Sequence, residues 1–582
     1  MCGIVSTICV RGGSELIAIE ALKRLEYRGY DSFGYFSSNL EYPRKFLGAI
    51  SDFKIESSLN PHSSITLAHT RWATHGGVSD SNCHPHVSMN GDCILVHNGV
   101  ISNYDILKSE LRDKGYTFYG KTDSEVVVNL IEAELRALLA SQLSKDVLYA
   151  PESIVKNVCA RLEGEFALCI YMPLWKDSIF AISRNSPLVL GRSDNTMMLA
   201  SDEIALRDFC DEYISVPQDE VVSIHRGAMS LIALTPKYQF WQELESYKGV
   251  GSLGCGESFF LKEMKEIPEA IQHSLEADTT ALATTKDRDI VLTGCGSAYY
   301  AAQIGMCIRR MNPDVLSRTL ALPADELEHM YKMQADDMLV CVSQSGETYD
   351  TIAPARHWDH TISITNSENS TLSKLSETHI YQNIGPERCV LSTKSIVSQC
   401  VILHKAFLPQ CVAIYNLPEV WQNCFNADLL KRIAQLAVKH SETQNYFHIG
   451  RGVFSPVAYE NALKLKEVTY VHAEGMSAGF FKHGTLSLID ERFITFAHLP
   501  SKDESELYAL TKANISEIKA RNGTVVTVGH DASCDFKLPN IAPSVNPILH
   551  LGFGQYYAYF LAKHLGRDVD KPRHLAKSVT VR

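Results

Sequence analysis

The sequence lacks the features that would place the protein in a membrane, outside the cell or on a nucleic acid. It has no run of about 18 apolar residues, so no membrane-spanning helix is expected. Its first residues show no basic stretch followed by an apolar one, which argues against a secretory signal. No cluster of about five Lys and Arg occurs, and the formal net charge of −12 argues against a nucleic-acid partner. These absences favour a soluble, cytoplasmic protein without membrane or nucleic-acid partners.

The sequence also lacks motifs with the spacing typical of metal ligands, although it contains many cysteines. The sixteen cysteines are scattered singly, and they form neither a CxxC pair nor a Cys/His spacing typical of zinc sites. Free thiols in a reducing compartment are the simplest interpretation.

One of these cysteines, Cys2, stands directly behind the initiator methionine. A buried strand residue is one interpretation, because Cys is small and the run from Ile4 to Ile8 is apolar. The alternative is that removal of Met1 leaves Cys2 with both a thiol and a free α-amine. An α-amine titrates at roughly 7.7–8.0, so it can act as the base for the thiol of the same residue. The first ten residues leave both interpretations open.

The chain of 582 residues is long enough for roughly three or four domains, and its pattern changes along the sequence. Residues 2–220 mix short β-rich runs with helical stretches, which predicts an α+β domain of layered sheets with helices outside. Residues 221–258 lose clear periodicity and contain several glycines, which predicts a linker. From residue 259 onwards buried strands alternate with amphipathic helices, as in α/β domains with a parallel sheet.

The second half is internally repeated. The segments DIVLTGCGSAYYAAQIG and NYFHIGRGVFSPVAYEN both run strand, Gly-x-Gly, helix, and their first glycines, Gly294 and Gly450, lie 156 positions apart. The same offset, to within one residue, carries LVCVSQSGETYDT onto ITFAHLPSKDESE. This repeat predicts two tandem α/β subdomains, at 259–425 and 426–572, with a polar tail over 573–582. The apolar residues within the tail predict that it packs against another part of the protein.

Two stretches of the second half carry candidate chemistry. The loop SQSGET brings hydroxyls and backbone N–H groups to a helix N-terminus, which suits a phosphate ester, although a capped turn is the alternative. In ENALKLKE the spacing places Glu460, Lys464 and Glu467 on one helix face. A solvated stripe of ion pairs is the alternative there.

In the first half, three motifs carry groups that suit the binding of an amino acid and the stabilisation of an oxyanion. Arg71 in HTRW suits a carboxylate, and Asp123 in TDSE suits an ammonium group. Asn98 and Gly99 in HNG supply the two kinds of donor that an oxyanion hole needs. The alternatives are a hairpin turn for Asn98 and Gly99 and a helix cap for Asp123.

The combination of motifs resembles a known family. MCGI, LEYRGYDS, HTRWATHG, HPH, HNG and TDSE resemble the class II glutamine amidotransferase domain, which is of the N-terminal-nucleophile type. GCGSAYY, SQSGET and STKS are similar to a first sugar-isomerase (SIS) domain, and ALKLKE, HAEG, KHG and DVDKPRHLAKSVTV to a second one with its tail. In this order they resemble the glutamine–fructose-6-phosphate aminotransferases (isomerizing), over essentially the whole chain.

For the first half the resemblance implies hydrolysis of the glutamine amide. Cys2 would attack the amide with its own α-amine handling protons, and Asn98 and Gly99 would stabilise the oxyanion. Trp72 would gate a channel for ammonia. The resemblance assigns glutamine binding to Arg71, Trp72, Thr74, His75 and Asp123, with Arg71 on the α-carboxylate and Asp123 on the α-amino group.

For the second half it implies a ketose phosphate that becomes an amino sugar. Lys577 would form a Schiff base with the sugar, Glu467 would move the proton between C1 and C2, and His483 of a neighbouring subunit would open the ring. The sugar-phosphate site is assigned to Ser297, Ser343, Gln344, Ser345, Thr348 and Ser392, with Glu460 and Lys464 in support. The expected reaction converts L-glutamine and D-fructose 6-phosphate to L-glutamate and D-glucosamine 6-phosphate, the first step of hexosamine synthesis, in a homodimer without metal or organic cofactor.

Four positions depart from the family pattern, and they keep alternatives open. Ala298 replaces a hydroxyl residue, Phe480 an acidic one, Phe33 a small one and Ile267 a glutamine. The loss of a hydrogen bond to a charged group typically costs about 1.5–3 kcal/mol, so the Ala298 change weakens the sugar site or relaxes its selectivity. A paralogue acting on another ketose phosphate is therefore the second hypothesis. A sugar-phosphate-binding regulator is a third, disfavoured because Cys2 and Lys577 are both retained.

Overall fold

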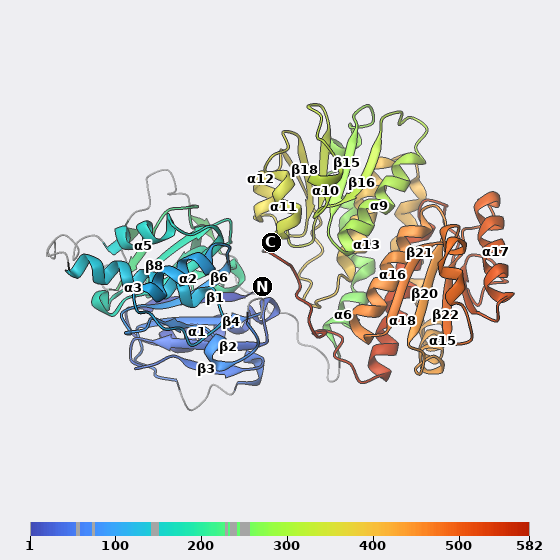
Figure 1. Ribbon diagram of the computed structural model, residues 1–582. Helices are drawn as coiled ribbons and strands as arrows, with labels where there is room; N and C mark the ends of the chain where they lie inside the picture. The colour runs from blue at the N-terminus through green and yellow to red at the C-terminus, as the bar shows by residue number, and fades with distance from the viewer. Residues whose placement is uncertain are drawn as a thin grey trace. The chain divides into compact units, whose positions relative to one another are not determined.

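The computed structural model describes residues 2–53, 59–72, 76–140, 151–226, 231–232, 241–244 and 257–580. The chain forms two compact units, residues 1–249 with 578–582 and residues 250–577 (Figure 1). Each unit has its own sheets and its own core.

The first unit contains two antiparallel sheets. Within the described residues, an eight-stranded sheet has the order β14-β11-β9-β10-β1-β4-β2-β3, and a six-stranded sheet has the order β13-β12-β8-β7-β6-β5. The first sheet consists of β1 (Gly3–Cys9), β2 (Ser32–Ser37), β3 (Arg44–Leu47), β4 (Ile65–Arg71), β9 (Val189–Arg192), β10 (Thr196–Ala200), β11 (Glu212–Ser215) and β14 (Gln242–Glu243). The second consists of β5 (His86–Val87), β6 (Ile94–Ile101), β7 (Gly164–Tyr171), β8 (Ser178–Arg184), β12 (Val222–His225) and β13 (Leu231–Ile232).

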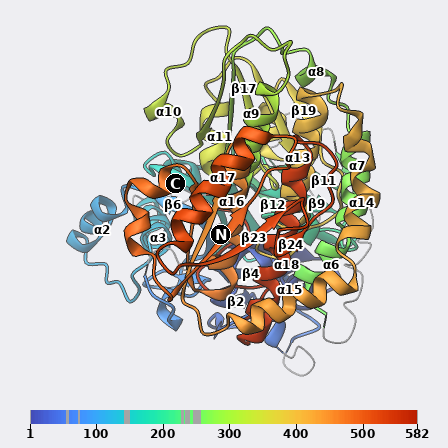
Figure 2. The ribbon, with the colours of Figure 1, turned by 90° about the vertical axis from the view of Figure 1, so that its right-hand side faces the viewer.

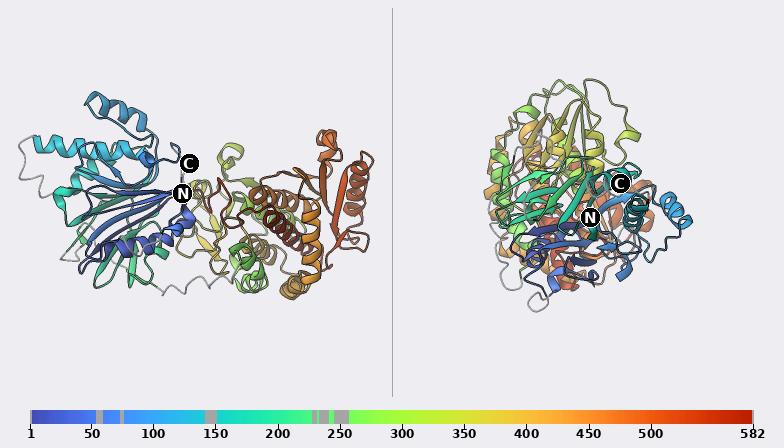
Figure 3. Two further views of the ribbon diagram at one scale, coloured as in Figure 1. Left: turned by 90° about the horizontal axis from the view of Figure 1, so that it is seen from below. Right: turned by 90° about the vertical axis from the view of Figure 1, so that its left-hand side faces the viewer.

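Alternation of side chains along the strands builds the layers of this unit. In β1, Ile4 and Ile8 point into the core shared by the two sheets, whereas Val5 points to the outer face and packs with α1. The helices are α1 (Ser14–Lys23) on the first sheet and α2 (Tyr104–Asp113), α3 (Ser124–Ala140) and α5 (Pro151–Cys159) on the second. Figure 3 shows the sheets nearly edge-on between these helices. The expected α+β layered-sheet domain is confirmed.

Three short strands lie inside the range 221–258 that we assigned to a linker. β12 pairs with β8, β13 pairs with β12, and β14 pairs with β11. The sheets of the first domain therefore extend beyond residue 220. These strands have too few residues to produce a recognisable alternation in the sequence.

The second unit contains two parallel sheets of identical order. The first, β16-β15-β17-β18-β19, consists of β15 (Ile290–Gly294), β16 (Thr319–Pro323), β17 (Met338–Val342), β18 (Thr361–Thr365) and β19 (Thr378–Tyr381). The second, β21-β20-β22-β23-β24, consists of β20 (Asn445–Gly450), β21 (His472–Ser477), β22 (Phe493–His498), β23 (Thr524–Gly529) and β24 (Phe536–Lys537). In both sheets the strand that comes first along the chain stands second in the order, with the next strand at the edge and the third strand on its other side. The expected pair of parallel-sheet subdomains is therefore confirmed.

Helices cover both faces of each parallel sheet. In the second sheet, Phe447 and Ile449 pack in one cluster with residues of α17, whereas Tyr446 and Phe496 belong to the core formed with α16 and α18. In Figure 2 helix α17 faces the viewer. That core continues into the first subdomain, so the two subdomains share one hydrophobic interior. The helices are α6 (Phe259–Lys265), α7 (Ile267–Glu276), α8 (Thr280–Ala283), α9 (Ser297–Arg310), α10 (Leu327–Met330), α11 (Tyr349–Ala355), α12 (Thr371–Leu375), α13 (Lys394–Phe407), α14 (Leu417–Cys424), α15 (Ala427–Lys439), α16 (Phe454–Thr469), α17 (Ser505–Lys519) and α18 (Asn546–His564).

Short 3-10 helices complete the connections between these elements. They are η1 (Glu26–Arg28), η2 (Ile50–Asp52), η3 (Asp80–Asn82), η4 (Pro173–Trp175), η5 (Glu203–Ala205), η7 (Val412–Asn416), η8 (Phe480–His483) and η9 (Thr485–Leu488). Across the described part of the chain, no helix combines the length and apolar character needed to cross a bilayer.

Candidate active sites in the two units

The thiol of Cys2 lies at the start of β1, beside the end of β4. The backbone N–H of Trp72, the residue after β4, donates a hydrogen bond to Cys2 Sγ over 3.3 Å. From β6 in the other sheet, Asn98 Nδ2 donates to the Cys2 carbonyl oxygen over 2.9 Å. Burial raises the pKa of the Cys2 thiol, so the group needs a base to become a thiolate. The structure thus brings together three of the predicted residues, Cys2, Trp72 and Asn98.

His69 in β4 fixes the orientation of the Asn98 amide. His69 Nε2 lies 3.0 Å from the carbonyl oxygen of His97 and 3.1 Å from Asn98 Oδ1. Both atoms are acceptors, so Nε2 carries the ring proton and donates to them. Burial lowers the pKa of His69 to about 3, and the imidazole is therefore neutral near pH 7. With Oδ1 turned toward His69, the Nδ2 donor of Asn98 faces Cys2.

Gly99 follows Asn98 within β6, at a position that only glycine fits. Its φ is +125°, and a Cβ there would lie 2.0 Å from the carbonyl oxygen of Glu165 on β7. Both residues pair with β7 inside the strand, opposite Ala167 and Phe166. The hairpin-turn alternative for Asn98 and Gly99 is therefore wrong.

Arg71 is buried at the end of β4 and holds the loop that follows it. Its guanidinium donates to the carbonyl oxygens of Gly76 and Gly77 over 3.0 and 3.2 Å. The same Gly77 oxygen accepts from Asn82 Nδ2, and Asn82 Oδ1 accepts from the N–H of Lys121 over 2.7 Å. This chain of hydrogen bonds connects the loop after β4 to the segment that precedes α3.

Asp123 occupies the end of that segment, buried beside the last residue of β6. Its carboxylate accepts from the backbone N–H groups of Ile101 and Ser124 over 2.8 and 2.9 Å. Four elements of the unit thus converge on one region, which is the arrangement expected for a binding site. Thr74 and His75, the remaining residues predicted to bind glutamine, lie outside the described residues.

In the second unit, the loop after β17 is a tight turn rich in hydroxyl groups. It contains four predicted residues, Ser343, Gln344, Ser345 and Thr348. Ser343 Oγ accepts from the N–H of Gly346 over 3.0 Å, and Ser345 Oγ accepts from the N–H of Glu347 over 3.1 Å. Gly346 has φ +66°, and a Cβ there would lie 2.1 Å from Ser370 Oγ. The loop lies at the carboxyl end of β17, next to β15, which is the switch point where ligands of such sheets bind.

Lys577, in the tail, reaches the first subdomain and meets a carboxylate that the sequence analysis did not single out. Lys577 Nζ lies 2.5 Å from Glu387 Oε2 and 3.3 Å from the carbonyl oxygen of Leu391. Ser395 Oγ donates to the same Glu387 oxygen over 2.8 Å and lies 2.6 Å from Ser392 Oγ. Two predicted residues, Lys577 and Ser392, are thus joined through Glu387 and Ser395. The prediction that the tail packs on the protein is confirmed.

The charged face of α16 is buried. Lys464 Nζ lies 2.7 Å from Glu467 Oε2 and 3.5 Å from Glu460 Oε1, and the side chains of Lys464 and Glu460 are each 1% exposed. Burial raises the pKa of Glu460 to about 7, although the nearby Lys464 acts against the rise. The solvated-stripe alternative is therefore wrong for Glu460 and Lys464. Ser297, at the start of α9 in the first subdomain, lies close to Glu460.

His483 stands apart from the other predicted residues. It ends η8 and is exposed, with its ring centroid 6.2 Å from that of Phe480. Phe480 is itself 67% exposed. In the part of the chain that the structure describes, His483 makes no hydrogen bond or ion pair with the other predicted residues.

The departures from the family pattern are accommodated in different ways. Phe33 is buried on the outer face of the first sheet, where its ring packs with those of Phe46 and Phe53 at 4.9 and 5.4 Å. Ile267 is fully buried in the core of the second unit. Ala298 lies in the first turn of α9, directly after Ser297, and presents a methyl group where the family pattern has a hydroxyl.

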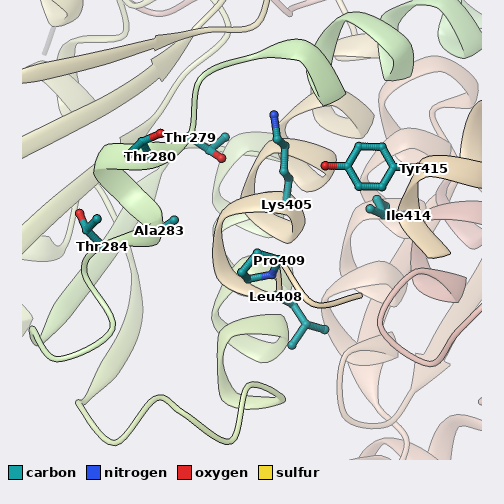
Figure 4. Close-up of a pocket in the computed structure, with 9 residues that line it drawn as sticks. All are labelled: Thr279, Thr280, Ala283, Thr284, Lys405, Leu408, Pro409, Ile414 and Tyr415. Carbon is teal, nitrogen blue, oxygen red and sulfur yellow. The ribbon is translucent and has the colours of Figure 1, made fainter. Parts of the chain in front are cut away.

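A separate cavity of about 260 Å³ opens between α8 and the end of α13 (Figure 4). Its lining includes Thr279, Thr284, Pro409 and Tyr415, and none of the predicted site residues. Lys405 at its edge donates to the carbonyl oxygens that end α7, at 275 and 277. This cavity is distinct from the two clusters described above.

Four residues in these clusters were missed from the sequence: Glu387, Thr393, Glu263 and His69. Glu387 pairs with Lys577 across 190 positions, and Thr393 with Glu263 across 130. Thr393 lies within the STKS segment, but nothing in the sequence indicates a carboxylate from α6 beside it. His69 was part of the HTRW motif, yet its bond to Asn98 depends on the packing of one sheet on the other.

Comparisons with known proteins match both halves of the chain. Residues 69–208 match the family described as a glutamine amidotransferase domain, and residues 284–409 match the SIS domain. The chain is 32% identical over 615 residues to a glutamine–fructose-6-phosphate aminotransferase [isomerizing] of Pyrococcus horikoshii, and 32% identical over 636 residues to one of Pseudomonas putida. Each alignment covers 100% of both chains.

Among solved structures, the chain is similar to the C-terminal domain of glucosamine-fructose-6-phosphate aminotransferase from Francisella tularensis. The two are 26% identical with a TM-score of 0.50, and the match covers 55% of this chain and 99% of that one.

We predict that Lys464→Met destabilises the second unit strongly. The substitution leaves Glu460 without its counter-charge in the interior, and breaking a buried pair in this way costs about 3–5 kcal/mol. The matched control is Lys482→Met, which removes a surface pair with Glu517 at 3.9 Å and should cost no more than about 1 kcal/mol. Denaturant unfolding of the full chain measures both. Equal losses for the two variants would contradict the prediction.

Proposed function

Because the chain belongs to the glutamine–fructose-6-phosphate aminotransferase (isomerizing) family, we propose how its two units divide that reaction. The enzyme transfers the amide nitrogen of L-glutamine to D-fructose 6-phosphate and releases L-glutamate and D-glucosamine 6-phosphate. Glutamine is hydrolysed in the first unit, and the sugar is captured and isomerised in the second. We further propose that the enzyme acts in the cytoplasm as a homodimer.

In the first unit, Cys2 is the nucleophile that attacks the glutamine amide carbon. Its own α-amine, once Met1 is removed, takes the thiol proton and then supplies one to the leaving ammonia. Asn98 Nδ2 and the N–H of Gly99 stabilise the tetrahedral oxyanion. The orientation of Asn98 supports this role, because its donor faces Cys2.

Binding and release of nitrogen use the residues around Cys2. Arg71 holds the α-carboxylate of glutamine and Asp123 its ammonium group, together with Thr74 and His75. Trp72, whose N–H contacts the thiol, gates the departure of ammonia. Confinement matters chemically, because ammonia in water becomes ammonium and loses its nucleophilic lone pair.

In the second unit, Lys577 forms a Schiff base with C2 of the open-chain ketose. Ser343, Gln344, Ser345 and Thr348 bind the phosphate at the switch point, with Ser297 and Ser392 beside them. Glu467 carries the proton between C1 and C2, and Glu460 with Lys464 holds it in place. His483 opens the sugar ring in the site of the partner subunit, which agrees with its exposed position here.

One observation carries the proposal: the chain retains a nucleophile in each unit, and each lies in a hydrogen-bonded polar cluster. Amide-¹⁵N glutamine with fructose 6-phosphate is predicted to yield ¹⁵N-glucosamine 6-phosphate. Cys2→Ala should make none from glutamine, because the thiol is gone. Lys577→Ala should still hydrolyse glutamine but make no amino sugar. Product analysis by mass spectrometry checks this, and equal amino sugar from wild type and Lys577→Ala would contradict the assignment.

His69 offers a test of the oxyanion site that separates hydrogen bonding from packing. His69→Met removes the donor to Asn98 and should lower kcat for glutamine hydrolysis, by up to the roughly 10²–10³-fold cost of losing an oxyanion donor, with little change in KM. His69→Gln has similar length and keeps a donor near the Nε2 position, so it should retain most of the activity. If both variants lose activity equally, His69 acts through packing alone.

A second candidate function, transfer to a different ketose phosphate, is favoured by Ala298. The missing hydroxyl stands next to Ser297 at the sugar site, where a lost hydrogen bond relaxes selectivity. Under the main proposal, we predict that kcat/KM is highest with fructose 6-phosphate. We also predict that Ala298→Thr raises the ratio of kcat/KM for fructose 6-phosphate to that for other ketose phosphates. A higher kcat/KM for another ketose 6-phosphate would favour the second candidate.

A further inference from the structure

A chain of three buried side chains leads away from the amine of Lys577. Glu387 Oε2 contacts Lys577 Nζ at 2.5 Å, and the other oxygen, Oε1, lies 2.9 Å from Thr393 Oγ1. On the far side, Thr393 Oγ1 lies 2.6 Å from Glu263 Oε2. All three side chains are at most 7% exposed. The roles proposed above use Lys577 but none of these groups.

The hydroxyl between the two carboxyl groups fixes their protonation. A threonine hydroxyl has one hydrogen, so it can donate to only one of Glu263 and Glu387. The other carboxyl must then carry a proton and donate it to Thr393 Oγ1. If both carboxyl groups were ionised, one carboxylate oxygen would face the hydroxyl oxygen with no hydrogen between them, which is unfavourable in the interior. One proton is therefore shared within the Glu263–Thr393–Glu387 chain.

Glu263 is the member that carries this proton. Burial and the neighbouring Glu387 charge raise its pKa, although Lys577 acts against the rise. Burial acts on Glu387 as well, but the contact with Lys577 and hydrogen bonds from its surroundings bring the pKa of Glu387 below its usual value. Glu387 accepts from the backbone N–H groups of Thr393 and Ser395, each over 2.9 Å. Only Glu387 is then ionised, and its charge balances that of Lys577.

We propose that Glu387 is a catalytic residue, the base and then the acid for the amine of Lys577, with Glu263 and Thr393 as positioning residues. The proposal rests on the Schiff-base role of Lys577. An ammonium nitrogen has no lone pair, so Lys577 must lose a proton before it attacks a carbonyl. Glu387 Oε2 is the acceptor in contact with that nitrogen.

The protons of the step balance. Lys577 gives one proton to Glu387, and its nitrogen lone pair attacks C2 while the carbonyl electrons move to oxygen. A second proton passes from the nitrogen to that oxygen, which forms the neutral carbinolamine. Glu387 returns its proton to the hydroxyl, water leaves, and the nitrogen lone pair forms the C=N bond. The iminium then lies beside the ionised Glu387, so the charge of the pair is unchanged.

The test is the rate at which fructose 6-phosphate and cyanoborohydride attach a reduced sugar adduct to the full chain at pH 7, followed by intact mass. Glu387→Gln should lower this rate by about 100-fold, within the range of general acid–base effects. The matched control is Glu266→Gln, which removes the half-buried carboxylate that contacts Lys394 at 2.6 Å, and it should keep the wild-type rate. A wild-type rate in Glu387→Gln, or an equal loss in Glu266→Gln, overturns the proposal.

Two further variants distinguish a loss of proton transfer from a loss of folding, and the role of Glu387 from that of Lys577. Glu387→Ala opens space for a small carboxylate, and added formate should restore adduct formation if the lost function is proton transfer. Absence of rescue in a folded Glu387→Ala protein counts against the proposal. Lys577→Arg should form no adduct, and an undiminished adduct there would instead refute the proposed role of Lys577 on which this inference rests.

Discussion

The second unit depends on one buried contact, the pair of Lys577 with Glu387. Taking each charge out of water costs several kcal/mol, so neither ion is stable in the interior without the other and its hydrogen bonds. Between residue 573 and residue 580 the tail that carries Lys577 forms no helix or strand. The pair and contacts such as the hydrogen bond from the N–H of Arg573 to the Tyr470 hydroxyl, over 2.9 Å, determine where the tail runs. A terminal segment thereby becomes part of a site built on the first parallel sheet.

The two groups that we propose as nucleophiles are held in opposite electrostatic states. Cys2 is a buried thiol whose pKa is raised, so it is stored neutral and needs a base. Lys577 is stored as an ion beside a carboxylate that can accept its proton. In each unit, a neutral group with one available hydrogen orients a polar side chain of the site. The His69 imidazole does this for Asn98, and the Thr393 hydroxyl does it for Glu387.

The duplication of the second unit explains why its two sheets contribute differently. Both have the same strand order, but the hydroxyl-rich loop over residues 343–348 follows β17 of the first sheet, whereas the second subdomain supplies α16 with its buried Glu460 and Lys464. The repeat and the alternation of strands were predictable from sequence, because periodicity and a constant offset are local properties. The contact of Glu387 with Lys577 and that of Glu263 with Thr393 could not be predicted from the sequence, because only the packed fold brings such distant positions together. The short strands β12, β13 and β14 could not be predicted for a different reason, because strands of two to four residues show no periodicity.

The proposed mechanism requires that Lys577, among the buried lysines of the second unit, captures the sugar. Peptide mapping after reduction of the adduct with fructose 6-phosphate tests this role most directly. We expect a single modified peptide that contains Lys577 in the tail. Modification of Lys464 or Lys394 in its place would contradict it.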